Sequence, residues 1–176
     1  MREEMPMRLF IAINFDENMT DALIEMQDDL MRWGVNGNFT REENLHMTLV
    51  FIGESDEPEK IEEIMRDVPL RSFTLQLSGM RRFKDMIFAN IEDNPDLNDY
   101  VKRLRHALAD NDIDFDKKKF VSHITLVRRA GGAKDIPMGY DGTMPEKMRV
   151  NGISLMKSEQ GRRGMAYTEI GYVRAF

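Results

Sequence analysis

The segments NLHMTLVFIG (residues 44–53) and VSHITLVRR (residues 121–129) contain the same pentapeptide apart from one residue, HMTLV in the first and HITLV in the second. The chain has three histidines, and two of them, His46 and His123, open these repeats. Both segments are apolar and of strand length, and β-branched residues are typical of strands. Because side chains alternate along a strand, the His and Thr of each repeat would share one face. The repeats therefore predict two similar strands, each presenting one imidazole and one hydroxyl.

Hydrophobic periodicity predicts strands and helices in alternation around these repeats. Residues 8–15 (RLFIAINF) form an apolar run of strand length. Apolar residues then recur at steps of three and four, which predicts a helix that Asn18 could cap and Gly34 could end. A second helix is predicted to open at Pro58 and a third to start at Asn94 and Pro95, because proline is favoured in the first helical turn. In both halves of the chain, a helix therefore precedes one of the repeats.

The remaining segments predict strands and a hairpin. FTLQLSG (residues 73–79) alternates apolar and polar side chains, and MIFANI (residues 86–91) is its predicted neighbour. RVNGISLMKSE and MAYTEIGYVRAF flank GRRG (residues 161–164), which predicts a closing hairpin. Residues 130–147, rich in Gly and Pro, predict a loop or a weak edge segment. Together these elements predict an α+β fold of two similar lobes, in one domain that spans residues 1–176.

Charge and composition narrow the possible functions. The net charge of -6 and the pI near 5.2 argue against a protein that coats nucleic acid through many phosphate contacts, so any phosphate site should be local. The absence of cysteine excludes disulfides, thiolate nucleophiles and cysteine-based zinc sites. The apolar run near the N-terminus is too short for a signal peptide or a membrane span. We therefore expect a soluble, cytoplasmic protein with no membrane partner.

Two such strands facing each other across a groove would supply two imidazoles and two hydroxyls around one small ligand. This set suits phosphoryl-ester chemistry without a metal, because one imidazole can accept a proton from water, the other can donate one to the leaving oxygen, and hydroxyls can hold the remaining oxygens. The candidate catalytic residues are thus His46, Thr48, His123 and Thr125. The third histidine, His106, falls on the helix face away from the core and is expected at the surface.

These residues resemble the 2H phosphoesterases, which are named for two H-x-[ST]-x motifs, and among them the RNA 2',3'-cyclic phosphodiesterase (2'-5' RNA ligase) family. The similarity runs through RLFIAINF, ENLHMTLVFIGE, SHITLVR and ISLMKSEQGRRGMAYTEI. It implies two pseudo-symmetric lobes, each an antiparallel β-sheet backed by helices, with both motifs in a central cleft. The resemblance also implies that His46 is the proton donor and His123 the proton acceptor. Thr48 and Thr125 would hold the phosphate.

The resemblance further implies metal-independent hydrolysis of RNA 2',3'-cyclic phosphate ends to 2'-phosphomonoesters, with reversible 2'-5' RNA ligation as an additional activity. No cofactor and no metal are expected. The expected partner is RNA with a 2',3'-cyclic phosphate end, with tRNA fragments among the candidates, and the expected oligomeric state is a monomer. A relative acting on another cyclic nucleotide or RNA 3' end would carry the same catalytic residues, so the sequence leaves the physiological substrate open.

Two functions of other classes stay open from the sequence. A zinc enzyme could use both motif histidines as ligands, but such a site needs a third ligand, and the second residue after each histidine is Thr. A non-catalytic RNA-binding module on the same fold would not need the His-x-Thr pairs and should expose stacking aromatic residues. A turnover assay distinguishes this module from an enzyme.

Basic residues near the motifs are candidate ligand contacts. By resemblance, Arg128 would contact the phosphate or the RNA. Strand alternation instead places Arg128 opposite to the motif histidine and favours Arg129, unless a bulge turns the strand. Short basic clusters at residues 81–82, 117–119 and 162–163 could guide RNA toward the cleft, although such clusters more often serve solubility.

Overall fold

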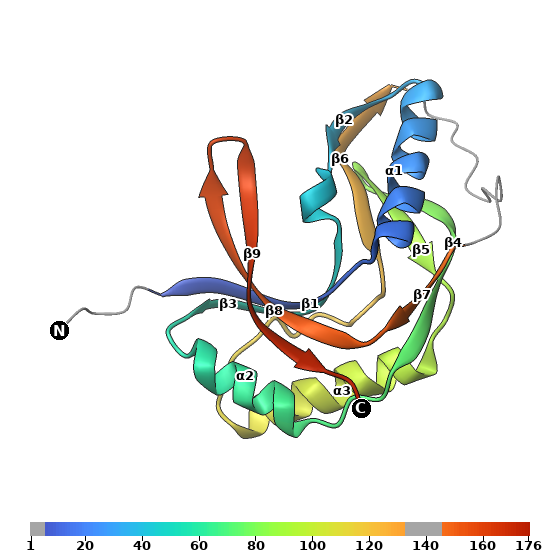
Figure 1. Ribbon diagram of the computed structural model, residues 1–176. Helices are drawn as coiled ribbons and strands as arrows, with labels where there is room; N and C mark the ends of the chain where they lie inside the picture. The colour runs from blue at the N-terminus through green and yellow to red at the C-terminus, as the bar shows by residue number, and fades with distance from the viewer. Residues whose placement is uncertain (1–5, 133–145) are drawn as a thin grey trace.

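Two antiparallel β-sheets form the framework of the protein. The computed structural model describes residues 6–132 and 146–176. Within them, one sheet has four strands in the order β3-β1-β8-β9 and the other has five in the order β2-β6-β5-β4-β7 (Figure 1). The first sheet contains β1 (Met7–Asn14), β3 (His46–Ser55), β8 (Gly152–Gly161) and β9 (Gly164–Arg174). The second contains β2 (Val35–Phe39), β4 (Phe73–Phe83), β5 (Met86–Ile91), β6 (Ile124–Gly132) and β7 (Lys147–Val150). The predicted α+β class is confirmed.

Helices cover one face of each sheet. α1 (Glu17–Arg32) packs against β2, β6 and β7 of the five-stranded sheet. α2 (Pro58–Asp67) and α3 (Pro95–Asp110) pack against each other and against β9 and β3 of the four-stranded sheet. In Figure 1 the two layers form two lobes, with α2 and α3 beneath the four-stranded sheet and α1 beside the five-stranded one. The expected pair of helix-backed sheets is confirmed, with α1 covering the five-stranded sheet and both α2 and α3 covering the four-stranded sheet.

The chain builds both lobes from alternating segments. β1 lies in the four-stranded sheet, α1 and β2 belong to the other lobe, and β3 returns to pair with β1. β4 and β5 then lie in the five-stranded sheet, α3 covers the four-stranded sheet, and β6 and β7 lie in the five-stranded sheet again. β8 and β9 complete the first lobe. As a result His46, the first residue of β3, and His123, just before β6, belong to different lobes.

α1 and α3 both begin at a capping residue of the predicted type, but the cap of α1 lies at a different position from the predicted one. Asn94 accepts a hydrogen bond from a backbone N–H of the first turn of α3 at 3.1 Å, and Pro95 opens that helix, as predicted. α1 is capped by Asp16, whose carboxylate accepts from the N–H of Met19 at 2.8 Å. The prediction of Asn18 as the cap is therefore wrong. Aspartate and asparagine are both favoured N-cap residues. Because β1 ends at Asn14 and α1 begins at Glu17, the N-cap position falls on Asp16.

Three features of the strands differ from the sequence prediction. β2, with the sequence VNGNF, was not predicted. β6 begins at Ile124, so His123 directly precedes the strand instead of lying in it. The predicted strand RVNGISLMKSE is divided, because β7 joins the five-stranded sheet and β8 joins the four-stranded one. Of the predicted loop or edge segment, residues 130–132 form the end of β6, residue 147 begins the edge strand β7, and residues 133–145 lie outside the described part of the chain.

Along the two motif strands, side chains alternate between the buried core and the opposite face of the sheet. In β3, Met47 and Leu49 are fully buried, whereas the motif His and Thr are partly exposed. In β6, Ile124 and Leu126 are buried in the same way. All four apolar side chains join one buried cluster that draws on both sheets and on α1, α2 and α3. The core thus fixes both motif strands from behind, as the repeats predicted.

Candidate active site

In both motif histidines, Nδ1 contacts the backbone carbonyl oxygen of the residue two positions earlier. His46 Nδ1 lies 2.6 Å from the carbonyl oxygen of Asn44, and His123 Nδ1 lies 2.8 Å from that of Val121. A carbonyl oxygen can only accept a hydrogen bond, so Nδ1 carries the proton in both neutral rings and Nε2 is the basic nitrogen. In His46, Nε2 lies 2.9 Å from Thr48 Oγ1, whose hydroxyl can donate to it. The backbone therefore sets the same tautomer in both lobes.

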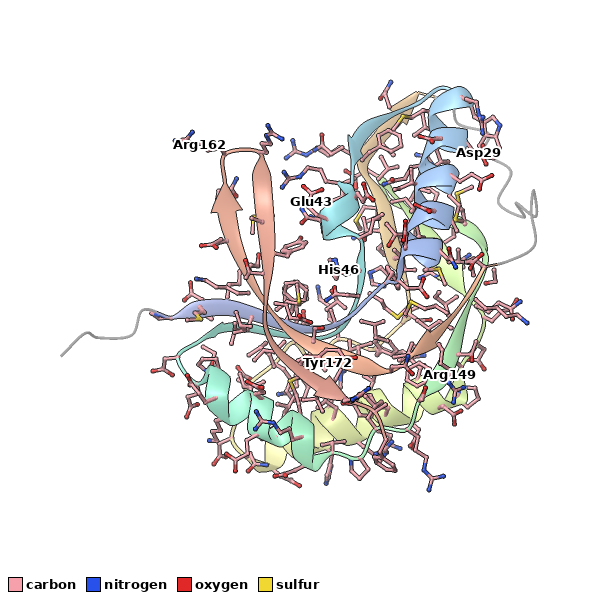
Figure 2. All side chains as sticks on the ribbon, viewed as in Figure 1. Asp29, Glu43, His46, Arg149, Arg162 and Tyr172 are labelled. Carbon is pink, nitrogen blue, oxygen red and sulfur yellow. The ribbon has the colours of Figure 1, made fainter. Side chains whose placement is uncertain are left out.

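Both motifs line one cleft between the lobes. The cleft has a volume of about 1330 Å³, and its lining includes His46, Thr48, His123, Thr125 and Arg128. Figure 2 shows His46 on the inner side of the molecule, between the β8–β9 hairpin and the lobe that contains β2, β6 and α1. The structure therefore brings all five candidate site residues together.

A β-bulge follows the threonine in both motif strands. In β3, Thr48 and Val50 lie opposite two consecutive residues of β1, so Leu49 is the extra residue. In β6, Thr125 and Val127 lie opposite two consecutive residues of β5, so the leucine after Thr125 is the extra residue. A bulge shifts the alternation of every side chain that follows it. Leu and Val of each motif consequently both face the core.

The bulges determine which residue enters the cleft next. Five residues after each motif histidine, Phe51 in β3 and Arg128 in β6 line the cleft. Strict alternation had favoured Arg129 over Arg128, and the structure places Arg128 in the lining instead. Arg129 adopts a left-handed backbone conformation with φ of 51° at a second irregularity, where β6 pairs with β2.

Contacts from α1 and β2 brace the bulge in β6. The carbonyl oxygen of Leu126 accepts hydrogen bonds from the backbone N–H of Thr40 at 2.9 Å and from Gln27 Nε2 at 3.1 Å. Gln27, a buried polar residue of α1, also donates to the carbonyl of Thr40 at 2.9 Å. In β2, a Cβ at Gly37 would lie 2.8 Å from the carbonyl oxygen of Arg128. Glycine at this position allows β2 to approach the bulged strand.

The β8–β9 hairpin is attached to the backbone that holds His46. Asn44 ends the short 3-10 helix η1 (Glu42–Asn44), and its side-chain amide donates to the carbonyl oxygen of Met165 at 2.8 Å. Arg41 Nη2 donates to the same oxygen at 2.8 Å. Asn44 therefore links the Nδ1 acceptor of His46 to the hairpin. Sequence reasoning missed this contact because it depends on β8 and β9 folding back over the site.

Burial and nearby charges act on the protonation of His46. Burial is the largest effect and lowers the pKa of His46 below its ordinary value of 6.5. The hydrogen bond to the Asn44 carbonyl opposes this shift, whereas the charges of Arg128 and His123 lower the pKa further. The neutral ring is thus favoured without a ligand. An anion bound near Arg128 and His123 would counteract their charges and favour the imidazolium form of His46.

Basic side chains gather in the cleft although the protein as a whole is acidic. Among the residues that the structure describes, eight Lys and Arg residues line the cleft, and Asp116 is the one acidic residue. The basic residues are Arg8, Arg41, Arg81, Arg105, Lys118, Lys119, Arg128 and Arg163. Each of the three basic clusters noted in the sequence contributes at least one of them. Charges of one sign that line a cleft concentrate the local potential, so the cleft can attract an anion despite a net charge of -6.

Aromatic rings pack against both histidines. Phe10 of β1 and Tyr167 of β9 each lie 5.1 Å from His46, measured between ring centroids. Phe88 of β5 lies 4.5 Å from His123. These contacts limit the rotation of the two imidazoles. No sequence pattern predicted these contacts, because they arise from the pairing of strands that are distant along the chain.

Other sequence expectations concern the surface and metal ligands. His106 has an 80% exposed side chain and lies 3.4 Å from Asp110 on α3, so its predicted surface position is confirmed. Residues 6–132 and 146–176 contain no group of three or more His, Cys, Asp or Glu side chains arranged to hold a metal ion. In the same part of the chain, no helix combines the length and hydrophobicity needed to span a lipid bilayer.

The fold and the site together define a phosphoesterase-like arrangement, with two His-x-Thr motifs on a basic cleft between two antiparallel sheets. Residues 34–162 match the 2'-5' RNA ligase superfamily. This match includes both motifs and most of the chain. The protein therefore belongs to the 2'-5' RNA ligase superfamily, as the resemblance of its motifs had predicted.

Individual relatives support the same assignment. The chain is 36% identical to an RNA 2',3'-cyclic phosphodiesterase of Thermotoga maritima over 69% of its own length and 70% of the relative's. It is 28% identical to an RNA 2',3'-cyclic phosphodiesterase of Methanothermobacter thermautotrophicus, over 97% of this chain and 100% of that one. The crystal structure of E. coli LigT in apo form matches with a TM-score of 0.81 and 26% identity, covering 97% of this chain and 98% of LigT. LigT has also been crystallised with 3'-AMP, ATP and NADP+.

Proposed function

We propose that this chain hydrolyses RNA 2',3'-cyclic phosphate ends to 2'-phosphomonoesters by paired histidine acid–base catalysis without a metal. The observation that carries the proposal is the pair of matching imidazole–hydroxyl sets, one from each lobe, on a single basic cleft. The relatives from Thermotoga and Methanothermobacter, both named RNA 2',3'-cyclic phosphodiesterases, support the substrate class. The 3'-AMP complex of LigT supports a cleft that accepts a phosphorylated ribose.

In the proposed reaction, a water molecule attacks the phosphorus atom while His123 Nε2 accepts its proton. The bond between phosphorus and the 3' oxygen breaks, and His46 donates a proton from Nε2 to that oxygen. The product keeps its phosphate on the 2' oxygen and has a free 3' hydroxyl. Each turnover leaves His46 neutral and His123 protonated, and proton exchange with solvent restores both rings.

The remaining candidate residues stabilise charge on the phosphoryl group. The hydroxyls of Thr48 and Thr125 and the guanidinium of Arg128 line the same cleft as the imidazoles. Donors already in place around the phosphoryl oxygens stabilise the transition state, because they need little reorganisation as negative charge develops there. The anionic substrate also favours the protonated form of His46 that the donor role requires, since it opposes the charges that lower its pKa.

An oligoribonucleotide that ends in a 2',3'-cyclic phosphate tests the proposal directly. We expect a 2'-phosphomonoester as the main product in phosphorus NMR, with turnover unchanged by EDTA. A predominantly 3'-phosphate product would contradict the assignment of His46 as donor and His123 as acceptor. Absence of turnover with a protein that binds the oligonucleotide would contradict the enzymatic function and favour the RNA-binding alternative.

We also propose 2'-5' RNA joining as a second activity of the same site, which the superfamily match favours. The 5' hydroxyl of a second RNA would replace water, with His123 accepting its proton and His46 again protonating the 3' oxygen. The test combines one RNA that ends in a cyclic phosphate with another that begins with a 5' hydroxyl. A joined product on a denaturing gel supports the activity, and hydrolysis without any joined product contradicts it.

A further inference from the structure

An array of aromatic rings extends from His46 along the wall of the cleft. The His46 ring packs against Phe10, and Phe10 stacks on Phe51 with 5.8 Å between ring centroids and 26° between planes. Phe10 is 2% exposed, but Phe51 is 41% exposed although it lines the cleft. The β3 bulge is responsible, because it turns Phe51 to the side of the sheet that carries the motif His and Thr.

A second array extends from His123 in the other lobe. The His123 ring packs against Phe88, and Phe88 stacks on Phe83 with 6.2 Å between centroids and 21° between planes. Phe88 is 6% exposed and Phe83 is 51% exposed, and both line the cleft. Each array therefore passes from a histidine through a buried phenylalanine to an exposed one. The two arrays lie on opposite lobes, and each begins at one of the two motif histidines.

Phosphate chemistry alone does not account for two exposed phenylalanines. A cyclic phosphate needs donors and cations, which the cleft supplies, and exposed aromatic rings add nothing to its binding. Flat apolar surfaces beside basic side chains are instead typical of sites for unpaired nucleobases, which stack on aromatic rings largely independently of base identity. Two such surfaces flanking one phosphate site match a ligand that has a nucleoside on each side of the phosphate.

We propose that Phe51 and Phe83 are nucleobase platforms, Phe51 for the nucleoside that carries the cyclic phosphate and Phe83 for a second nucleoside joined through its 5' oxygen. The assignment of sides rests on the proposed function. His46 protonates the 3' oxygen of the first ribose, so this ribose and its base lie on the Phe51 side. His123 faces the attacking oxygen, so a second nucleoside approaches from the Phe83 side.

Basic residues near the second platform fit a strand that continues from the second nucleoside. The guanidinium carbon of Arg81 lies 5.4 Å from the centroid of Phe88, and Lys84 Nζ lies 5.4 Å from that of Phe83. These cations place positive charge where the next phosphate of the second strand would pass. The ligand class is therefore a 2'-5' phosphodiester between two unpaired nucleosides, with both bases stacked.

Direct binding to two ligands tests the proposal. Calorimetry compares 2'-AMP, which has one base, with 2'-5'-linked adenylyl adenosine, which has two, for the unmodified protein and for Phe51→Ala and Phe83→Ala. Loss of one base stack corresponds to about 5- to 150-fold in Kd. We expect Phe51→Ala to weaken both ligands by this factor, and Phe83→Ala to weaken only the dinucleotide.

Control variants separate stacking from bulk. Phe83→Tyr keeps a flat ring and should bind like the unmodified protein, whereas Phe83→Leu should bind like Phe83→Ala. Phe176→Ala removes a 77% exposed ring that does not line the cleft, and should change neither affinity. Equal losses of Phe83→Ala for both ligands, or no loss for the dinucleotide, would overturn the proposal. Hydrolysis of the cyclic phosphate is measured separately, so absent turnover with the expected binding pattern refutes the proposed function and supports the platforms.

Discussion

Replacement of Gln27 by leucine tests whether the bulge in β6 places Arg128 in the cleft. The substitution keeps a similar volume but removes the amide that donates to the carbonyl oxygens of Thr40 and Leu126. The Leu126 oxygen keeps its bond from the Thr40 N–H, so the bulge is weakened without being abolished. Gln27 itself does not line the cleft. Any change in ligand binding must therefore act through the backbone that Gln27 holds, either in β6 or at Thr40, which lines the cleft.

The size of the effect follows from these two hydrogen bonds. Each contributes about 0.5–1.5 kcal/mol, so Gln27→Leu should lower the free energy of unfolding by about 1–3 kcal/mol, less any gain from the buried leucine side chain. A hydrogen bond from Arg128 to an anion is worth about 1.5–3 kcal/mol. A partly displaced Arg128 should lose a fraction of this, which we expect to appear as a several-fold rise in the Kd for inorganic phosphate.

A double-mutant cycle with Arg128→Ala distinguishes this route from general loosening of the fold. Urea denaturation gives the stability of each variant, and calorimetry with phosphate gives its affinity. If Gln27 acts through Arg128, Gln27→Leu should weaken phosphate binding in the unmodified protein and have little effect in the Arg128→Ala background. Equal weakening in both backgrounds, or a lower stability with unchanged affinity, would refute the reasoning.

Four further predictions concern catalysis, protonation and the core. Turnover of the cyclic phosphate should survive EDTA, because the imidazoles move the protons and the hydroxyls hold the phosphate; loss of activity that zinc or magnesium restores would contradict this. His46→Ala and His123→Ala should each lower the rate about 100-fold or more, whereas His106→Ala should leave it unchanged in the same assay. Binding of sulfate, a fully ionised anion, should be accompanied by proton uptake, and its affinity should rise as the pH falls toward the lowered pKa of His46. For one titrating group, this rise in affinity is at most about tenfold per pH unit. Calorimetry in two buffers of different ionisation enthalpy measures the proton uptake, and pH-independent binding would exclude the coupling. Tyr100→Phe should raise the free energy of unfolding in urea by about 1 kcal/mol, because the buried Tyr100 hydroxyl has no hydrogen-bond partner among the described residues; a clear loss of stability would indicate a partner such as water.

Local patterns in the sequence were sufficient to predict the elements that carry the site. The His-x-Thr-Leu-Val repeats have an apolar side that alternates with a polar one, so both motif threonines were expected beside their histidines. Asn94 and Pro95 marked the start of α3, and GRRG marked the β8–β9 turn. These signals lie within a few residues of the features they predict. The position of both motifs in one cleft came from the resemblance of the whole chain.

Features that depend on contacts between distant segments could not be predicted. The two bulges occur within Thr-Leu-Val, a sequence that alternation alone describes as a regular strand, and the bulge in β6 is braced by Gln27 about a hundred residues earlier. β2 has Gly and Asn in place of alternating apolar residues, and it is held by its pairing with β6. The Phe10 and Phe88 contacts with the histidines likewise require cross-strand neighbours to be known.

The alternating path of the chain between the two sheets has a consequence for how the protein unfolds. A cut anywhere between β3 and β6 would leave each fragment with strands from both sheets and with one of the two motif histidines. Neither lobe can therefore be produced as a separate continuous polypeptide. We expect heat or denaturant to melt both lobes in one transition, so that the cleft is lost together with the core and not by separation of two intact halves.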